Sequence, residues 1–192
     1  MRASGFVLAG GASTRMGRAK ALLPYRGTAL VEYVAGAVRE AAGGVTLIGD
    51  PAQFSHLGLP VLADEVPACG PAGGIYTALL RTVTDWNLIL ACDMPAVSAA
   101  VLRELLEEAE GSAAGCIVAA GPGGWPEPLC AVYHRRCLPV LERAIEEKRL
   151  KMRDLVGEMG AHLVTLPPSA VANVNTPAEW SEFVSSAPGE AR

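Results

Sequence analysis

The 192-residue sequence has few aromatic residues (5%), few charged residues (19%) and a formal net charge of only −4. The hydrophobic fraction of 51% is too high, and the charge too low, for a disordered chain. The small acidic net charge also argues against a dedicated nucleic-acid binder, which would usually carry a basic stripe. Any anionic ligand must therefore be held by local geometry, because the chain has no overall positive field.

Long hydrophobic runs and paired cysteines are also missing. The uncharged run from Gly111 to Pro126 is interrupted by glycines and prolines, whereas a membrane-spanning helix needs about 20 mostly apolar residues. The apolar stretch near the N-terminus is too short for a signal peptide, so no membrane partner is expected. The five cysteines form no C-x-x-C pair and the three histidines are scattered. This pattern argues against a disulfide framework or a zinc site, and it favours buried thiols in a reducing cytoplasm.

Apolar runs and amphipathic segments alternate along the chain. Strands are expected at 5–9, 45–48, 61–63, 86–92, 116–120, 129–133 and 162–166. Helices are expected at 28–42, 75–83, 98–110, 137–147, 152–159 and from 176 onward. Strand–helix alternation predicts an α/β fold with a mainly parallel central sheet, right-handed crossovers and helices on both faces. No repeat, linker or change of composition divides the chain, so residues 1–192 are expected to form a single domain.

A glycine-rich and basic segment follows the first expected strand. Gly10 and Gly11 allow the backbone to approach a ligand closely, so that successive N–H groups can point at one anion. Three cations follow within the next nine residues: Arg15, Arg18 and Lys20. Neither the P-loop pattern nor the dinucleotide G-x-G-x-x-G pattern is present. The segment indicates an anionic nucleotide loop, although a glycine-rich turn with solvated basic residues has the same spacing.

Two carboxylates end other expected strands. Asp93 follows the strand at 86–92, and Asp64 follows the strand at 61–63. Because ligands of open parallel sheets bind beyond the carboxyl ends of the strands, both should lie at the edge where the glycine loop begins. Asp93 suits Mg²⁺, which prefers one or two protein carboxylates, and Asp64 suits the N–H and O–H donors of a base or ribose. Each aspartate also fits an ordinary loop or a turn that starts a helix.

Two alternating asparagines, Asn173 and Asn175, precede the last expected helix. In an extended segment their amide groups fall on one side, where a polar ligand can reach them. Asn175 and Thr176 also fit a simpler role, because Thr176-Pro177-Ala178-Glu179 is a capping box with proline at the first helical position.

Five segments resemble blocks of the molybdenum cofactor guanylyltransferases, the MobA family, in order and at similar intervals. They are LAGGASTRMGRAKALL (8–23), GPAGGI (70–75), ACDMP (91–95), EPLCAVY (127–133) and NVNTPAEW (173–180). The first block is shared by many nucleotidyltransferases, whereas the last two are more specific. The resemblance implies a Rossmann-like nucleotidyltransferase fold, transfer of GMP from GTP to molybdenum-bearing molybdopterin, release of pyrophosphate and dependence on Mg²⁺.

The resemblance also implies roles for individual positions. Nucleotide contacts are expected from Leu8, Ala9, Gly10, Gly11, Lys20, Asp64, Gly73 and Asp93. The expected catalytic set is Lys20, Arg15 and Asp93, with Asp93 also holding Mg²⁺. Asn173 and Asn175 are expected to contact the pterin. Residues 1–97 would form the nucleotide-binding half and residues 98–192 the acceptor half.

The sequence departs from the family pattern at two places. The region after the second strand reads Ile48-Gly49-Asp50-Pro51, where family members often carry asparagine, so one base or ribose contact lacks its usual residue. GPAGG also replaces the commoner GPLAG, which is a milder change. Related cytidylyltransferases tend to read LAAG where this chain reads LAGG, which favours guanine. A basic group formed by Arg135, Arg149, Lys151 and Arg153 fits either a pterin-binding surface or a solvated helix face.

Two other functions stay open at this point. One is a cytidylyl- or sugar-phosphate nucleotidyltransferase. The other is a non-catalytic module that carries molybdopterin to a partner enzyme, although a pure carrier has less need of both Lys20 and Asp93. The resemblance implies GTP and molybdopterin as substrates, transient contact with molybdoenzymes or cofactor-handling proteins, and a monomer or weak oligomer.

Overall fold

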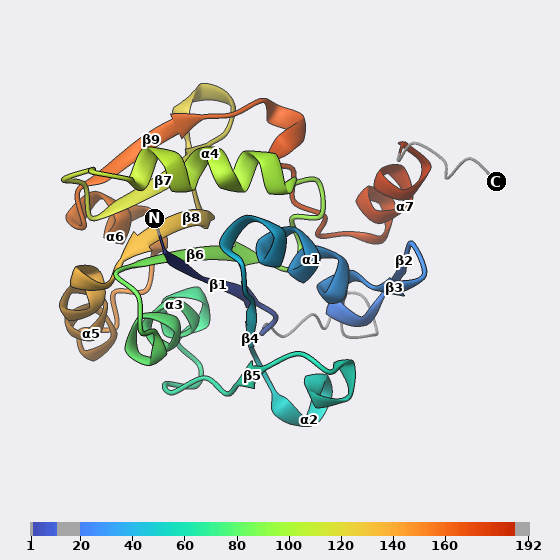
Figure 1. Cartoon of the computed structure of the whole chain (residues 1–192), viewed down its shortest axis with the longest axis horizontal. Coiled ribbons are helices and arrows are strands. Elements are labelled where there is room, and N and C mark those ends of the chain that lie inside the picture. Colours follow the sequence, from blue (N-terminus) through green and yellow to red (C-terminus); the bar gives the residue numbers. More distant parts are fainter. Residues whose placement is uncertain (1, 11–19, 187–192) are drawn as a thin grey trace.

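The computed structural model describes residues 2–10 and 20–186. Within these residues a seven-stranded sheet has the order β5-β4-β1-β6-β8-β7-β9, and β2 pairs with β3 in a separate ribbon (Figure 1). The strands are β1 (Ala3–Leu8), β2 (Pro24–Tyr25), β3 (Thr28–Ala29), β4 (Thr46–Ile48), β5 (Val61–Leu62), β6 (Trp86–Ala91), β7 (Cys116–Ala120), β8 (Pro126–His134) and β9 (Ala161–Thr165). All of the strands expected from the sequence are present, with small shifts at their ends.

The sheet is mainly parallel, as expected. Strand β1 pairs in parallel with β4 and β6, β4 pairs in parallel with β5, and β7 pairs in parallel with β9. Strand β8 is the exception, because it runs antiparallel to both β6 and β7. Strand–helix alternation therefore breaks between β7 and β8. The connecting segment at 121–125 is too short for the crossover of a dozen or more residues that parallel strands need, so the chain turns back as a hairpin.

Helices cover both faces of the sheet (Figure 1). They are α1 (Leu30–Ala42), α2 (Pro51–Phe54), α3 (Gly70–Arg81), α4 (Ala99–Ala109), α5 (Leu138–Glu146), α6 (Met152–Glu158) and α7 (Pro177–Ser186). Helices α1 and α4 pack over one face, and α3, α5 and α6 pack over the other. Strand β6 is buried throughout, with Leu88 and Leu90 in the first core and Ile89 in the second. Burial on both faces explains why its sequence shows no polar alternation.

Helix α3 begins earlier than the sequence pattern suggests. GPAGG forms its first turn, with Pro71 near the start, where the missing N–H costs nothing. The glycines are needed for close packing: a Cβ on Gly73 would lie 2.9 Å from the carbonyl oxygen of Val66, and a Cβ on Gly74 would lie 3.1 Å from Leu8. The start of α3 is thereby held against the end of β1.

Backbone hydrogen bonds extend the sheet past the ends of its strands. The N–H of Cys92 donates to the carbonyl of Leu8 at 3.1 Å, and the N–H of Ala9 donates to the carbonyl of Ile48 at 2.9 Å. The N–H of Gly49 donates to the carbonyl of Leu62 at 2.9 Å. The segments that follow β1, β4, β5 and β6 are therefore aligned at one edge, which is where a ligand of an α/β sheet is expected.

Cysteine chemistry agrees with the sequence expectation. All five cysteines are free thiols, and Cys116, Cys130 and Cys137 are buried. Burial raises the pKa of the Cys116 and Cys130 thiols to about 12, so both stay protonated and unreactive at neutral pH. In the described parts of the chain, no helix has the length and apolar character needed to cross a membrane.

Candidate active site

Three residues from distant parts of the chain meet at the carboxyl edge of the sheet. Lys20 opens a short 3-10 helix, Asp93 follows β6, and Asn175 lies just before α7. The Nζ of Lys20 lies 3.3 Å from Oδ2 of Asp93 and donates a hydrogen bond to Oδ1 of Asn175 at 3.2 Å. Lys20 is only 6% exposed, whereas 29% of the Asp93 side chain is exposed. The lysine is thus fixed in place, while the carboxylate remains open to a ligand or a cation.

The segment that carries Asn175 is held by its own hydrogen bonds. The backbone N–H of Val174 donates to the carbonyl of Asp93 at 2.9 Å. The Glu179 carboxylate accepts from the N–H groups of Asn175 and Thr176, and these bonds lower the pKa of that carboxyl, with the Asn175 bond contributing most. The capping box expected from the sequence is therefore present. It caps α7 and at the same time fixes Asn175 beside Lys20, so the two roles considered for Asn175 are compatible.

Asp64 lies at the same edge, next to the end of β1. A Cβ on Gly10 would lie 3.5 Å from Oδ2 of Asp64, and a Cβ on Gly74 would lie 3.8 Å from Oδ1. Burial raises the pKa of the Asp64 carboxyl. Its Oδ1 atom is buried and has no hydrogen-bond partner in the described structure. A buried acceptor without a donor calls for an explanation, and a ligand that supplies the donor would satisfy it.

Asp64→Asn should stabilise the ligand-free protein by about 1 kcal/mol at pH 8, because a neutral amide costs less to bury than a carboxylate. The pKa of Asp64 is raised in the folded state, so the folded protein holds this proton more tightly than the unfolded chain does. The associated stability is present at low pH and is lost as pH rises through the folded pKa. The advantage of Asp64→Asn should therefore grow as pH rises from about 4 to 8.

Urea unfolding at about pH 4 and about pH 8 measures the difference in stability between Asp64→Asn and the parent protein. Asp85→Asn, at an exposed position, serves as the control. An advantage that does not change with pH, or a variant less stable than the parent at pH 8, would contradict the assignment. A ligand that donates to both Asp64 oxygens should bind the same variant more weakly, because the amide cannot accept with both of its polar atoms.

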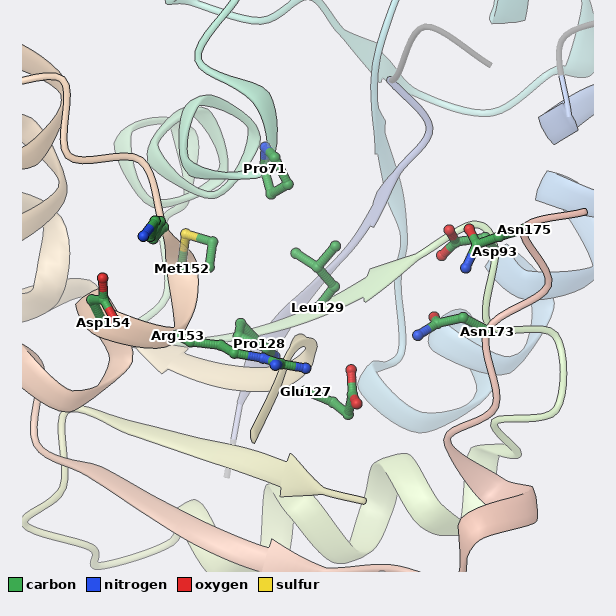
Figure 2. A pocket seen from close by; sticks show the side chains of 11 residues that line it. Pro71, Asp93, Glu127, Pro128, Leu129, Met152, Arg153, Asp154, Asn173 and Asn175 are labelled. Atoms are coloured by element: carbon green, nitrogen blue, oxygen red, sulfur yellow. The ribbon is translucent and has the colours of Figure 1, made fainter. Parts of the chain in front are cut away.

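A cavity of about 450 Å³ opens beside Asp93. In Figure 2, Asp93, Asn173 and Asn175 lie on one side, while residues of α6 lie on the opposite side and residues of β8 lie between them. The complete lining is Pro71, Asp93, Glu127, Pro128, Leu129, Lys151, Met152, Arg153, Asp154, Asn173 and Asn175. The Lys20 cluster therefore has the glycine-rich edge of the sheet on one side and this cavity on the other.

The basic group expected from the sequence is divided by the fold. Lys151 and Arg153 line the cavity. Arg149 is instead paired with Glu147 and Glu158, at 2.7 and 2.5 Å. Arg135 lies at the opposite end of β6, where its backbone N–H bonds to the carbonyl of Asp85. Two of the four residues thus have the position needed to meet an acceptor substrate.

Most of the sequence-predicted site residues converge. Leu8, Ala9, Gly10, Asp64 and Gly73 lie at the carboxyl edge of the sheet near the end of β1, and Lys20, Asp93, Asn173 and Asn175 lie at or beside the cavity. Gly11 and Arg15 lie outside the described residues. Asp50, which stands where many family members carry asparagine, accepts a hydrogen bond from the N–H of Ala52 and caps α2.

Sequence reasoning missed Glu127 as a site residue, although the EPLCAVY block contains it. Its carboxyl lines the cavity, and burial raises its pKa, while the nearby Arg153 charge and a side-chain hydrogen bond with Asn173 oppose the increase. One sequence feature could have indicated Glu127: it is an acidic residue at the start of a strand whose other inward-facing positions are apolar.

A buried lysine, an open carboxylate and close-packed glycines at the carboxyl edge of an α/β sheet, with a cavity alongside, are compatible with a nucleotidyltransferase. Comparisons with known proteins agree. The family model described as the MobA-like NTP transferase domain matches residues 5–163. The chain belongs to this MobA-like NTP transferase family.

Relatives match over nearly their whole lengths. A probable molybdenum cofactor guanylyltransferase of Flavobacterium johnsoniae is 32% identical, with 93% of this chain and 94% of the relative covered. One of Bacillus subtilis with the same description is 33% identical, with 91% of each chain covered. The crystal structure of molybdopterin-guanine dinucleotide biosynthesis protein A from Archaeoglobus fulgidus is similar with a TM-score of 0.79 and 24% identity, covering 95% of this chain and 97% of that one. The structural likeness shows a shared fold.

Proposed function

We propose that this protein transfers GMP from GTP to molybdenum-bearing molybdopterin and releases pyrophosphate. The observation that carries the proposal is the position of the Lys20–Asp93–Asn175 cluster between two spaces, the glycine edge with Asp64 and the cavity lined by β8 and α6. A group-transfer enzyme with two substrates needs such a junction. Residues 1–97 would supply the nucleotide contacts and residues 98–192 most of the acceptor cavity. The names of the relatives supply the identity of the two substrates.

The chemistry requires positioning and charge stabilisation. An oxygen of the acceptor's terminal phosphate forms a bond to the α-phosphorus of GTP, and the bond from that phosphorus to the bridging oxygen breaks. Pyrophosphate leaves with the electron pair. A phosphate monoester is already anionic near neutral pH, so no general base is needed. Lys20 would neutralise charge that develops on the phosphates, as would Arg15 of the preceding loop.

Asp93 fits a Mg²⁺ site. Its carboxylate is a hard oxygen donor, is partly open to solvent, and lies beside the fixed Lys20. Among the described residues no cluster of three or more His, Cys, Asp or Glu side chains could hold a metal by itself. One carboxylate completed by substrate phosphates and water is the arrangement that Mg²⁺ prefers. When bound, the ion would polarise phosphate oxygens and reduce their charge.

A pyrophosphate-release assay with GTP, CTP and ATP tests the proposal. We expect release only with GTP, and only when molybdopterin and Mg²⁺ are both present. Release with CTP instead would support a cytidylyltransferase, and release with a sugar phosphate as acceptor would support a sugar-phosphate nucleotidyltransferase. GTP binding without any release would support the carrier module. Each of these three outcomes would contradict guanylyl transfer.

The cellular setting follows from the same proposal. Five free thiols fit a reducing compartment, and we infer that the protein works in the cytoplasm. GTP and molybdopterin would be its substrates. Transient contact with molybdoenzymes or cofactor-handling proteins, and a monomeric or weakly oligomeric state, remain predictions of the family resemblance.

A further inference from the structure

Glu127 is a polar residue of the cavity that the proposed reaction does not use. It is the second residue of β8, and Pro128 and Leu129 follow it along the cavity. Figure 2 shows its carboxylate between the end of the Arg153 side chain and the Asn173 amide. Glu127 pairs with Ala119 of β7, and β6 joins the other side of β8 from Cys130 onward. A carboxylate on such a support is well suited to select a ligand by hydrogen bonding.

The neighbours of Glu127 hold its carboxylate in one place. The Arg153 charge and the Asn173 side chain both lower the pKa of this carboxyl and so favour its ionised form, against the burial that raises it. Arg153 is itself held over the ring of Trp125, with 5.6 Å between its guanidinium carbon and the ring centroid. Pro71, Pro128, Leu129 and Met152 give the cavity an apolar part, and Asp93, Lys151 and Asp154 line it as well. The combination is a partly apolar cavity in which the Glu127 carboxylate offers two acceptor oxygens beside Arg153 and Asn173.

This combination matches one edge of a pterin ring. The ring is flat and apolar on its faces, and its amino–amide edge presents two parallel N–H donors, from the 2-amino group and from N3. An ionised carboxylate accepts two such hydrogen bonds side by side. The carbonyl oxygen next to N3 needs a donor, and the Asn173 and Asn175 amides each carry an NH₂ group.

We propose that Glu127 is a specificity-determining residue for the acceptor, accepting both hydrogen bonds from the amino–amide edge of the pterin. The inference rests on the proposed function, since it takes molybdopterin as the acceptor. Asn173 and Arg153 act as positioning residues that hold the carboxylate in the plane of the ring. Sites built to hydrogen-bond a substrate reject analogues that lack the donor, because the buried acceptor is then left without a partner.

Glu127→Gln is the direct test, because it keeps the shape of the side chain and replaces one acceptor by a donor. We expect the KM for molybdopterin to rise by about 10- to 100-fold, the range for a lost charged hydrogen-bond pair, while the KM for GTP stays within about twofold. Glu142→Gln on the exposed surface of α5 is the matched control and should change neither constant. An unchanged KM for molybdopterin, or an equal rise for GTP, would overturn the proposal.

A binding measurement separates recognition of the pterin from a merely structural role. 6-Hydroxymethylpterin is compared with 6-hydroxymethyllumazine, which carries a carbonyl oxygen in place of the 2-amino group, by ligand fluorescence titration. The parent protein should prefer the pterin by at least about 10-fold, and Glu127→Gln should lose that preference. The inference would be overturned if the parent protein bound the pterin and the lumazine equally well, or if Glu127→Gln still preferred the pterin. Neither result would affect the proposed function, which fails only if the parent releases no pyrophosphate from GTP and molybdopterin.

Discussion

Asp93→Ala is expected to lower the rate of guanylyl transfer by about 10²- to 10³-fold or more, because it removes the open carboxylate that lies beside Lys20 and lines the cavity. The loss should appear in kcat, since the carboxylate acts on charge that develops as the α-phosphorus is transferred. The fold should survive. The Asp93 side chain is 29% exposed, and the hydrogen bond from the N–H of Val174 is accepted by the backbone carbonyl of Asp93, which the substitution keeps.

Asp85→Ala is the matched control for Asp93. Asp85 lies at the opposite end of β6 from Asp93 and is exposed, so its loss should leave turnover unchanged. Pyrophosphate release under saturating GTP and molybdopterin gives kcat, and thermal unfolding reports the fold. A folded Asp93→Ala protein with near-normal turnover would refute the assignment of this site.

Lys20→Met should have a comparable effect, about 10²- to 10³-fold in kcat, for a different reason. Methionine fills nearly the same volume but carries no charge, so the substitution tests the cation alone. Lys20 is 6% exposed and is fixed by Asp93 and Asn175, so its charge is positioned before a ligand binds. A compact point charge held in this way stabilises a leaving pyrophosphate without reorganising during the reaction.

Stability measurements distinguish this catalytic role from a structural one. Removing Lys20 leaves Asp93 without its cation, but water reaches that carboxylate, so the penalty of an unpaired buried charge does not apply in full. We expect the midpoint of thermal unfolding of Lys20→Met to stay within a few degrees of the parent protein. Lys148→Met, at an exposed position after α5, is the control for loss of positive charge. Normal turnover in Lys20→Met, or loss of activity explained by unfolding, would contradict the assigned role.

Local sequence patterns predicted the fold well because they report burial directly. The uninterrupted apolar run of β6 requires a strand covered on both faces, and the structure buries all of its residues. Ser98 was expected to cap a helix, and its side chain accepts a hydrogen bond from the N–H of Val101. The sequence pattern was less informative at the start of α3. Glycine and proline there indicate a turn when they are considered without their tertiary contacts. Contacts with Val66 and Leu8 explain why glycine occupies the first turn.

The small ribbon of β2 and β3 shows what local patterns do not contain. Two-residue strands have no periodicity to detect, and this ribbon is stabilised by contacts from far along the chain. Tyr25 packs against Trp180 and Phe183 of α7, with ring centroids 5.7 and 5.2 Å apart. This contact anchors α7 beside the ribbon, and with it the segment that carries Asn175.

The alternation of apolar runs and amphipathic segments determined the class of fold, and the glycine-rich segment and the strand-ending carboxylates indicated the edge that carries the chemistry. They did so because the position of a residue relative to its own strand is a local property of the chain. Tertiary structure alone decided which of these groups meet. Lys20, Asp93 and Asn175 are separated by up to 155 positions, and their contact depends on the order of the strands and the docking of α7. The same long-range packing places Lys151 and Arg153 at the cavity and makes Glu127 part of its lining.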